Sequence, residues 1–437
     1  MTILQTLTKK KKALLLALCL AGLCAACSRD DAANSMITTA MDDAQWFVTE
    51  EEAMEKLREF DESHIATRAE ERTVACVETL HRSALGTATR NRTSDDTPLA
   101  YIVNFAEGGY AVVGADSRQG GVVARVEKGS MDAATLAAAK QSIDKAEAEA
   151  DIDLATYVNG KVALQLLQAI EHAPEADEVS EAAALRSTRW TPIEINLYKL
   201  KTEWDQWSPF NQYYYQQTGN NYPVGCVALA LAQVMIYNKH KHDVGINSFN
   251  ANTTPLLPQP YYPIWQFLTR TLENPTPAIE CQMELSKFLY HIGKSVHMQY
   301  YSTVSKTDTS FAIGFLNKIP GYKNVVEKAA NFQDIKKMLD ADNLVYIDGQ
   351  AKTDNGHYYK GEEISGGHAW VIDGYDVKID LLPGWSNGQQ ITIQKETRLV
   401  HCRFGYKGYL DGWYEFTNSN TLVSEVYRTE EMIYYTL

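Results

Sequence analysis

A cysteine and a histidine, each preceded by glycine, carry the strongest chemical signal in this chain. Cys226 follows Gly225 and opens a strongly apolar run, and His368 follows Gly367 at the start of a strand-like stretch. A thiol attacks only as its thiolate, and a free thiol has a pKa of about 8.5. The start of a helix and a neighbouring imidazole both favour the thiolate. The pair therefore predicts a nucleophilic thiol–imidazole site, with a buried core cysteine as the alternative for Cys226.

The segment around Cys226 and His368, residues 190–437, runs from helices to strands, which is an α+β order. The run 227–237 is apolar on nearly every side and predicts a buried helix led by Cys226. Further helices are expected over 278–296 and, with Asn331 as N-cap, up to residue 339. A period of two then predicts strands over 344–347, 368–372, 391–393, 399–404, 413–416 and 432–437. We expect the Cys226 helix to pack against an antiparallel sheet that carries His368, with the cleft between them.

The first block, residues 30–171, predicts a smaller α+β unit. It contains a short helix over 50–60, a hairpin over 101–105 and 110–113, a strand over 121–126 and mostly helical sequence over 131–170. The stretch 172–187 is acidic, rich in small residues and unpatterned. It indicates an exposed linker that is open to proteolysis.

The N-terminus predicts export. Four lysines at positions 9–12 precede an apolar run over 13–23 and small residues that lead to Cys27. This is the order of a secretory signal, and the apolar run is shorter than the roughly 20 residues of a spanning helix. The segment resembles a bacterial lipoprotein box in which Cys27 is lipidated, although Cys24 departs from the usual box. We expect an outer-membrane or cell-surface lipoprotein, or a protein secreted after processing, and secretion without a lipid is the alternative.

Composition excludes several classes of protein. The 437 residues carry a net charge of −14, and loss of residues 1–27 with their four lysines gives −14 − 4 = −18. Such an acidic chain is a poor partner for nucleic acid. Outside the signal, Cys76, Cys226, Cys281 and Cys402 are too dispersed for a disulfide scaffold and form no CxxC pair. The histidines of the run 240–242 lack a third ligand at metal-binding spacing, so we expect a solvated helix end.

The second block resembles the streptopain family of papain-like cysteine peptidases. The resemblance covers nearly all of residues 190–437 in the right order, and the separation of 142 residues between Cys226 and His368 fits papain-like order. The matching motifs are GCVA (225–228) with AQVMIY (232–237), GHAWVIDG (367–374), WDQ (204–206) ahead of PFN (209–211), and the middle region 278–300. The first block, with its hairpin and the run 114–118, resembles the propeptide of the family.

The resemblance implies a signal over 1–27, a propeptide and linker over 28–188, and a papain-like α+β domain over 189–437. It implies a zymogen that cuts proteins and is inhibited by its own propeptide, with no metal and no organic cofactor. Cys226 is then the nucleophile and His368 the acid and base, and Gln206 completes the oxyanion hole. Its partners are protein or peptide substrates, and it meets the membrane only through the lipid on Cys27.

One motif departs from the family pattern. Arg403 stands where the family carries an asparagine, and Phe404 and Tyr406 stand for tryptophans. The asparagine accepts the imidazole Nδ1–H and fixes the ring, whereas arginine has no acceptor and its charge disfavours an imidazolium. A catalytically impaired, protein-binding pseudopeptidase therefore stays open, as does a thiol acyl-transfer enzyme such as an amidase or transglutaminase. His401 is interpreted as structural.

Overall fold

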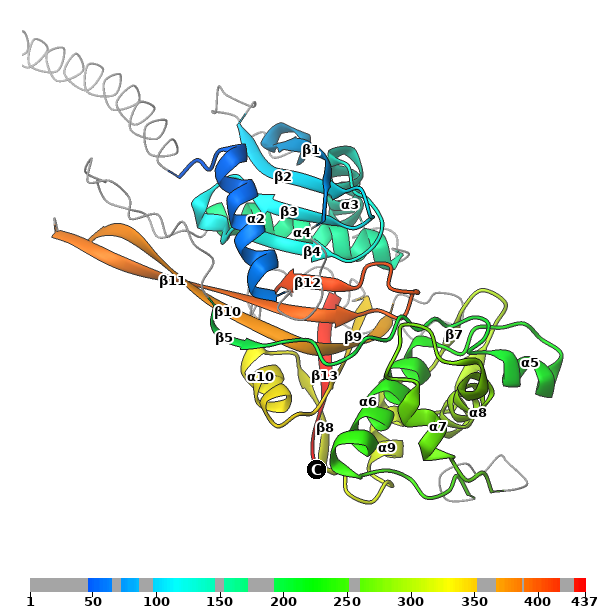
Figure 1. The fold of residues 1–437 in the computed structure, drawn as a ribbon. Coiled ribbons are helices and arrows are strands. Elements are labelled where there is room, and N and C mark those ends of the chain that lie inside the picture. Colours follow the sequence, from blue (N-terminus) through cyan, green and yellow to red (C-terminus); the bar gives the residue numbers. More distant parts are fainter. Residues whose placement is uncertain are drawn as a thin grey trace, which may run out of the picture.

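One antiparallel sheet runs through the molecule. The computed structural model describes residues 46–64, 72–85, 97–145, 153–171, 192–250, 260–351, 367–386, 389–416 and 428–437. Within them, eleven strands form a sheet of order β1-β2-β3-β4-β12-β11-β10-β9-β13-β8, with β5 paired to β10 (Figure 1). The predicted signal with Cys27, the linker 172–187 and the boundaries at 27 and 188 lie outside the described residues.

The N-terminal block (residues 46–171) is a four-stranded sheet between helices. Its strands are β1 (Val74–His81), β2 (Pro98–Phe105), β3 (Tyr110–Gly114) and β4 (Val122–Val126). Successive residues of β2 enter different cores: Tyr101 and Val103 pack in the cluster with helix α2 (Glu50–His64), and Ile102 packs in the cluster with α3 (Ala133–Lys145) and α4 (Leu154–Glu171). The predicted hairpin, third strand and helices are confirmed. Helix α2 is longer than expected, and β1 was not predicted because its residues are mostly exposed without alternation.

The C-terminal block (residues 192–437) has helices on one side and strands on the other. The helices are α5 (Gln212–Thr218), α6 (Cys226–His242), α7 (Trp265–Arg270), α8 (Ile279–Ser295) and α9 (Thr309–Leu316). Figure 1 shows these helices gathered together, beside β9 (Val345–Ala351) and β10 (His368–Ser386). Helix α6 is buried from Val227 to Asn238 and contacts both strands. The predicted packing of the Cys226 helix on the sheet that carries His368 is confirmed.

The remaining elements complete the C-terminal block. Helix α10 (Phe332–Asp340) is capped as predicted, because the Asn331 side chain accepts from the Asp334 N–H at 2.9 Å. The strands are β5 (Pro192–Asn196), β6 (Gln299–Tyr300), β7 (Ser305–Lys306), β8 (Lys323–Ala329), β11 (Gln389–Arg403), β12 (Gly412–Glu415) and β13 (Arg428–Thr436). The predicted strand 391–393 and residues 399–403 of the predicted strand 399–404 are parts of β11, which pairs with β10 in a long projecting ribbon (Figure 1).

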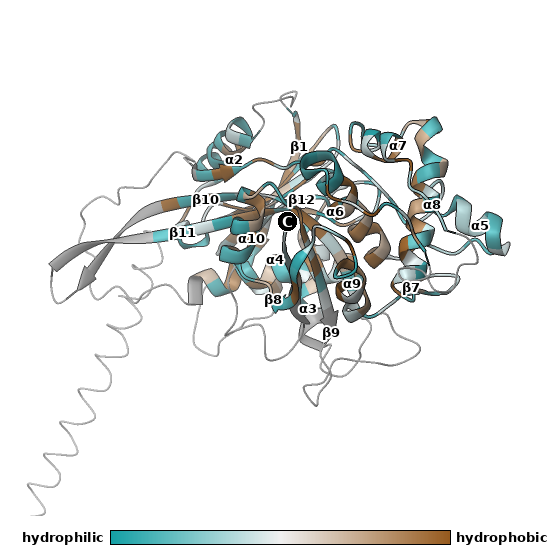
Figure 2. Ribbon diagram, turned by 90° about the horizontal axis from the view of Figure 1, so that it is seen from below, coloured by the Kyte–Doolittle hydropathy of each residue, from teal (hydrophilic) through white to brown (hydrophobic). Residues whose placement is uncertain are grey.

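The two blocks share their sheet and their core. Strand β4 pairs with β12, and the Glu127 N–H donates to the Asp411 carbonyl at 2.8 Å. One hydrophobic cluster contains side chains of both blocks, from Leu80 to Tyr435. In Figure 2 the outer helices α2 and α5 are mainly hydrophilic, and hydrophobic residues gather toward the middle of the molecule. Within the described ranges, no helix has the length and apolarity needed to cross a membrane.

Candidate active site

Cys226 is the first residue of α6 and lies behind a strained glycine. Gly225 has φ 90°, and a Cβ there would lie 2.6 Å from the Met298 methyl carbon. Only glycine adopts this conformation readily, and it brings the chain close to Met298. The first helical hydrogen bond runs from the Leu229 N–H to the Gly225 carbonyl at 3.1 Å. The N–H groups of the preceding helical residues, including Cys226, therefore lie outside the helical ladder and can act as oxyanion donors.

The Cys226 thiol lies against the first residues of β10. Burial raises the pKa of this thiol, and the nearby Asp348 carboxylate adds to the rise. The backbone N–H groups of Ala369 and Val227 act in the opposite direction by hydrogen bonding to the sulfur. In this conformation burial therefore favours the neutral thiol. The hydrogen bond from Ala369 also places the sulfur beside the residue that follows His368.

His368 is oriented by a backbone carbonyl. Its ring is 7% exposed, and Nε2 lies 2.8 Å from the Phe404 carbonyl oxygen. A carbonyl only accepts, so Nε2 carries the hydrogen and donates it. Nδ1 is then the ring nitrogen that can exchange a proton with a thiol. The ring also stacks on Tyr406, with the ring centroids 5.2 Å apart.

Gln206 and Tyr406 join the site from two loops. The Gln206 carbonyl accepts from the Val224 N–H at 2.9 Å, which ties its loop to the segment before the nucleophile. Its side chain hydrogen-bonds the Tyr406 hydroxyl. Burial raises the pKa of Tyr406 to about 12, the Cys226 thiolate adds to the rise and the Gln206 hydrogen bond opposes it. Tyr406 therefore interacts with all three predicted site residues. It stacks on His368, hydrogen-bonds the Gln206 side chain, and has a pKa that the charge on Cys226 raises.

The structure brings together Cys226, His368 and Gln206, which were each predicted from sequence. Two further residues of this site were not. Tyr406 carried a signal, since it occupies a tryptophan position of the family motif. Asp348 carried none, because an acidic residue at the end of a predicted strand is usually solvated, whereas this one is buried and accepts from the Thr309 hydroxyl at 2.6 Å.

Although Arg403 stands at the asparagine position, another group accepts the hydrogen bond from His368, which is one of the possibilities that the sequence left open. The acceptor is the carbonyl of the following residue, Phe404, and the donor is Nε2 rather than Nδ1. The Arg403 guanidinium is buried away from the imidazole. It donates to the Glu127 carboxylate and the Leu200 carbonyl, both at 2.8 Å.

His401 belongs to the same buried charge cluster as Arg403. Its Nδ1 lies 2.6 Å from Asp373, and its Nε2 lies 3.1 Å from Glu127. Against the effect of burial, the Asp373 carboxylate raises the pKa of His401. The structural interpretation of His401 fits these contacts.

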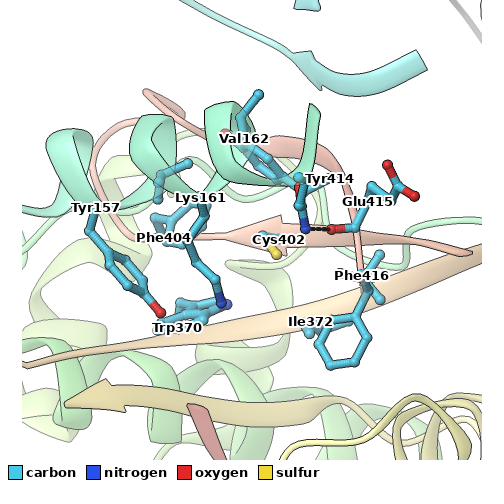
Figure 3. A pocket seen from close by; sticks show the side chains of 13 residues that line it. Tyr157, Lys161, Val162, Trp370, Ile372, Cys402, Phe404, Tyr414, Glu415 and Phe416 are labelled. Carbon is cyan, nitrogen blue, oxygen red and sulfur yellow. Dashed lines mark hydrogen bonds between the residues drawn. The ribbon is translucent and has the colours of Figure 1, made fainter. Parts of the chain in front are cut away.

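A pocket separates α4 from strands β10, β11 and β12. Figure 3 shows Tyr157 and Lys161 reaching from α4 toward Trp370. The Gln165 side chain donates to the Glu415 carbonyl at 2.5 Å. Burial raises the pKa of Glu415 to about 7. The other lining residues, mostly apolar, are Val158, Val162, Ile372, Val400, Cys402, Phe404, Tyr414 and Phe416. Helix α4 thus covers the face of the sheet formed by β10, β11 and β12, near the start of β10.

The cysteines and histidines outside the site form no other centre in the described part of the chain. None of Cys76, Cys226, Cys281 and Cys402 takes part in a disulfide there, and Cys281 and Cys402 are buried. No group of three or more His, Cys, Asp or Glu side chains with metal-binding geometry occurs among the residues that the structure describes.

Comparison with known proteins agrees with this geometry. Residues 204–414, which include all three predicted catalytic residues, match the sequence profile of the Peptidase C10 family, and residues 38–149 match that of the Spi protease inhibitor. Streptopain of Streptococcus pyogenes is 22% identical over 336 residues, which cover 73% of this chain and 74% of streptopain.

Two solved structures from Prevotella intermedia are also similar. A prointerpain A fragment is 18% identical with a TM-score of 0.45, over 76% of this chain and 94% of that chain. Active interpain A is 20% identical with a TM-score of 0.36, over 55% and 95%. By these two profile matches and the similarity to streptopain, residues 204–414 form a segment of the Peptidase C10 (streptopain) family of cysteine peptidases, and a segment that matches the Spi protease inhibitor precedes it.

Proposed function

We propose that this chain is the precursor of an exported cysteine endopeptidase that hydrolyses proteins through Cys226 and His368. The match to this family supports a cysteine peptidase made as a zymogen. The observation that carries the residue assignment is the meeting of three separate segments. Helix α6 begins at Cys226, strand β10 begins at His368 beside the thiol, and the Gln206 loop joins them through Tyr406.

Each residue has one task in the proposed reaction. The Cys226 thiol loses its proton to Nδ1 of His368, and the sulfur attacks the peptide carbonyl carbon. The Cys226 N–H and the Gln206 side-chain amide donate to the resulting oxyanion. His368 gives the proton to the departing amine as the C–N bond breaks, which leaves a thioester. Water then attacks the thioester, His368 takes one of its protons, and the C–S bond breaks to return the thiol and release a carboxylic acid.

The N-terminal block acts as the inhibitor in this proposal. It covers the sheet next to the site with α4, and it pairs with β12 through β4. The raised pKa of Cys226 supports an inactive precursor, because a neutral thiol is a weak nucleophile. Cleavage between residues 171 and 192 would release this block.

Export and anchoring rest on the sequence of residues 1–27. We propose that the chain is exported and lipidated at Cys27 after cleavage of the signal. Incorporation of a labelled fatty acid tests this, since Cys27→Ser is expected to abolish the label and to leave the chain soluble. Equal labelling of both chains would contradict the lipid anchor.

Maturation of the purified full-length chain tests the catalytic assignment. Wild type and Cys76→Ala, which removes an exposed thiol, are expected to mature and to release new N-termini from a denatured protein. Cys226→Ala is expected to do neither, and Gln206→Ala to be slower by about 10²–10³-fold, as on loss of one oxyanion donor. Equal maturation of Cys226→Ala and wild type, or ligated instead of cleaved products, would refute the proposal.

A catalytically impaired, protein-binding lipoprotein is the second candidate. It applies if the pKa of Cys226 stays raised once the N-terminal block has been removed, because a neutral thiol is a weak nucleophile. Alkylation of Cys226 across pH, once the N-terminal block has been removed, separates the two candidates. Reaction at about pH 5 indicates an ion pair and an enzyme, whereas titration at about pH 8.5 indicates the binding protein.

A further inference from the structure

The carbonyl that orients His368 belongs to a loop that is closed by a buried carboxylate. The Phe404 N–H donates to Asp411 Oδ1 at 2.7 Å, so the loop from 404 to 411 is tied across its base. The Asp411 N–H donates back to the Gly408 carbonyl at 3.3 Å. Asp411 is 1% exposed, and its side chain therefore has a fixed environment. The position of the Phe404 carbonyl depends on this one carboxylate.

Arg403 holds that carboxylate from the other side. Its Nη1 lies 3.4 Å from Asp411 Oδ2, and its Nη2 donates to the Leu200 carbonyl at 2.8 Å. Asp373 Oδ2 lies 3.7 Å from Nε and accepts from the Leu200 N–H at 2.8 Å. The planar guanidinium thus bridges three separate parts of the C-terminal block, which a lysine ammonium could not do in the same geometry.

We propose that Arg403 and Asp411 are positioning residues that fix the Phe404 carbonyl and, through it, the tautomer and the orientation of His368. The inference rests on the proposed function. In the family pattern an asparagine side chain accepts from the imidazole. In this chain the arginine at that position acts one step away, by fixing the backbone that accepts.

The chemistry of the histidine explains why this matters. A hydrogen bond from Nε2–H leaves Nδ1 to exchange protons, and it stabilises the imidazolium form. An acceptor displaced from 2.8 Å weakens both effects, because hydrogen bonds fall off steeply with distance and angle. Loss of either positioning residue is therefore expected to lower the fraction of enzyme that holds the reactive thiolate–imidazolium pair.

Four full-length variants test the inference. Asp411→Asn keeps the size and an acceptor for the Phe404 N–H but loses the ion pair, and Arg403→Met removes the guanidinium. Arg403→Lys keeps the charge and serves if Arg403→Met does not fold. Glu284→Gln is the matched control, because Glu284 is a buried carboxylate of α8 that accepts from the Ile264 N–H at 2.8 Å, outside the catalytic site. Chains that do not mature alone are processed with a trace of wild type.

The readouts are kcat, KM and the pH profile of kcat/KM on a short peptide, with Tm as the measure of stability. Asp411→Asn and Arg403→Met are expected to lower kcat about tenfold, the effect of one charge-assisted hydrogen bond, with little change in KM. The alkaline limb of the profile is expected to move to lower pH, and Arg403→Lys to lie between wild type and Arg403→Met. A fifth chain that combines Asp411→Asn with Arg403→Met is expected to lose no more activity than the worse single variant.

The control separates positioning from stability. Glu284→Gln is expected to lower Tm and to leave kcat and the pH profile unchanged. If the Arg403 and Asp411 variants behave like this control while wild type is active, the positioning role is wrong and the proposed function stands. If wild type itself cleaves no peptide after processing, the proposed function is wrong and the positioning role falls with it.

Discussion

Glu127 of the N-terminal block contacts a buried cluster of charged side chains in the C-terminal block, which includes His401 and Arg403. One carboxylate oxygen accepts from Arg403 at 2.8 Å, and the other lies 3.1 Å from His401 Nε2. Although burial opposes it, the Arg403 and His401 charges hold the pKa of Glu127 well below its usual range. The Glu127 carboxylate is therefore ionised at neutral pH, and Glu127→Gln is expected to weaken the contact between the N-terminal and C-terminal blocks.

The magnitude follows from the contacts. Two charge-assisted hydrogen bonds contribute about 1.5–3 kcal/mol each, and glutamine retains part of the hydrogen bonding. The Glu127 side chain is 27% exposed, which reduces the effect through solvent screening. Arg403 also keeps Asp411 as a partner, so no buried charge is left unpaired. About 2 kcal/mol remains, which corresponds to roughly 30-fold more of the open form at equilibrium.

Alkylation of Cys226 in the unprocessed full-length chain measures this opening, because the N-terminal block covers the site in the proposed precursor. Mass spectrometry of the Cys226 peptide distinguishes it from the exposed Cys76. Glu127→Gln is expected to raise the alkylation rate by roughly 30-fold and to speed maturation. Glu280→Gln, which removes an exposed ion pair with Arg270, is the control and is expected to change neither rate. Rates for Glu127→Gln within twofold of wild type would refute the reasoning.

Three further perturbations address the site and the sheet. Tyr406→Ala removes the ring that stacks on His368 and is expected to lower kcat/KM about 3- to 10-fold, with a smaller loss for Tyr406→Phe, in assays of processed enzyme on a short peptide. Gly225→Ala forces an alanine to φ 90°, so maturation on a gel is expected to fail and Tm to fall, while a normal Tm with full activity would contradict the strain argument. Burial and the neighbouring Glu431 carboxylate raise the pKa of Glu327 to about 7, above its value in the unfolded chain. The folded state therefore binds this proton more tightly, and the associated stability is lost as pH rises through about 7. Glu327→Gln, in an inactive background, is expected to raise Tm at pH 8 but not at pH 4, and equal shifts at both would refute the assignment.

Local pattern was enough to find the parts of the site that chemistry and burial impose on the sequence. The apolar run behind Cys226 identified α6, since a helix buried on all sides needs such a run. The alternation of residue types after His368 identified the start of β10. The β2–β3 hairpin of the N-terminal block was predicted in the same way. These features depend on neighbours a few residues apart.

Features that depend on residues far apart in the sequence could not be predicted. The pairing of β4 with β12 joins segments that are almost 300 residues apart, and nothing in either strand specifies the other. The role of Arg403 depends on carboxylates from the residue after β4, from β10 and from the loop before β12. From the sequence, the arginine left a catalytically impaired site open as an alternative to an active peptidase. Strand β8 is largely exposed, so burial left no alternation to detect, and the alternation in β5 extends over only five residues.

Processing changes the border of the sheet at β12. In the precursor, β4 pairs with Gly412, Trp413 and Tyr414 of β12. The proposed release of the N-terminal block would leave the backbone groups of these residues without their β4 partners. An unpaired edge strand can hydrogen-bond with strands of other molecules, and it therefore favours aggregation. The released N-terminal fragment carries β4, and it can stay paired with β12 until it is degraded. The lifetime of the fragment is then expected to govern the colloidal behaviour of the enzyme as well as its activity.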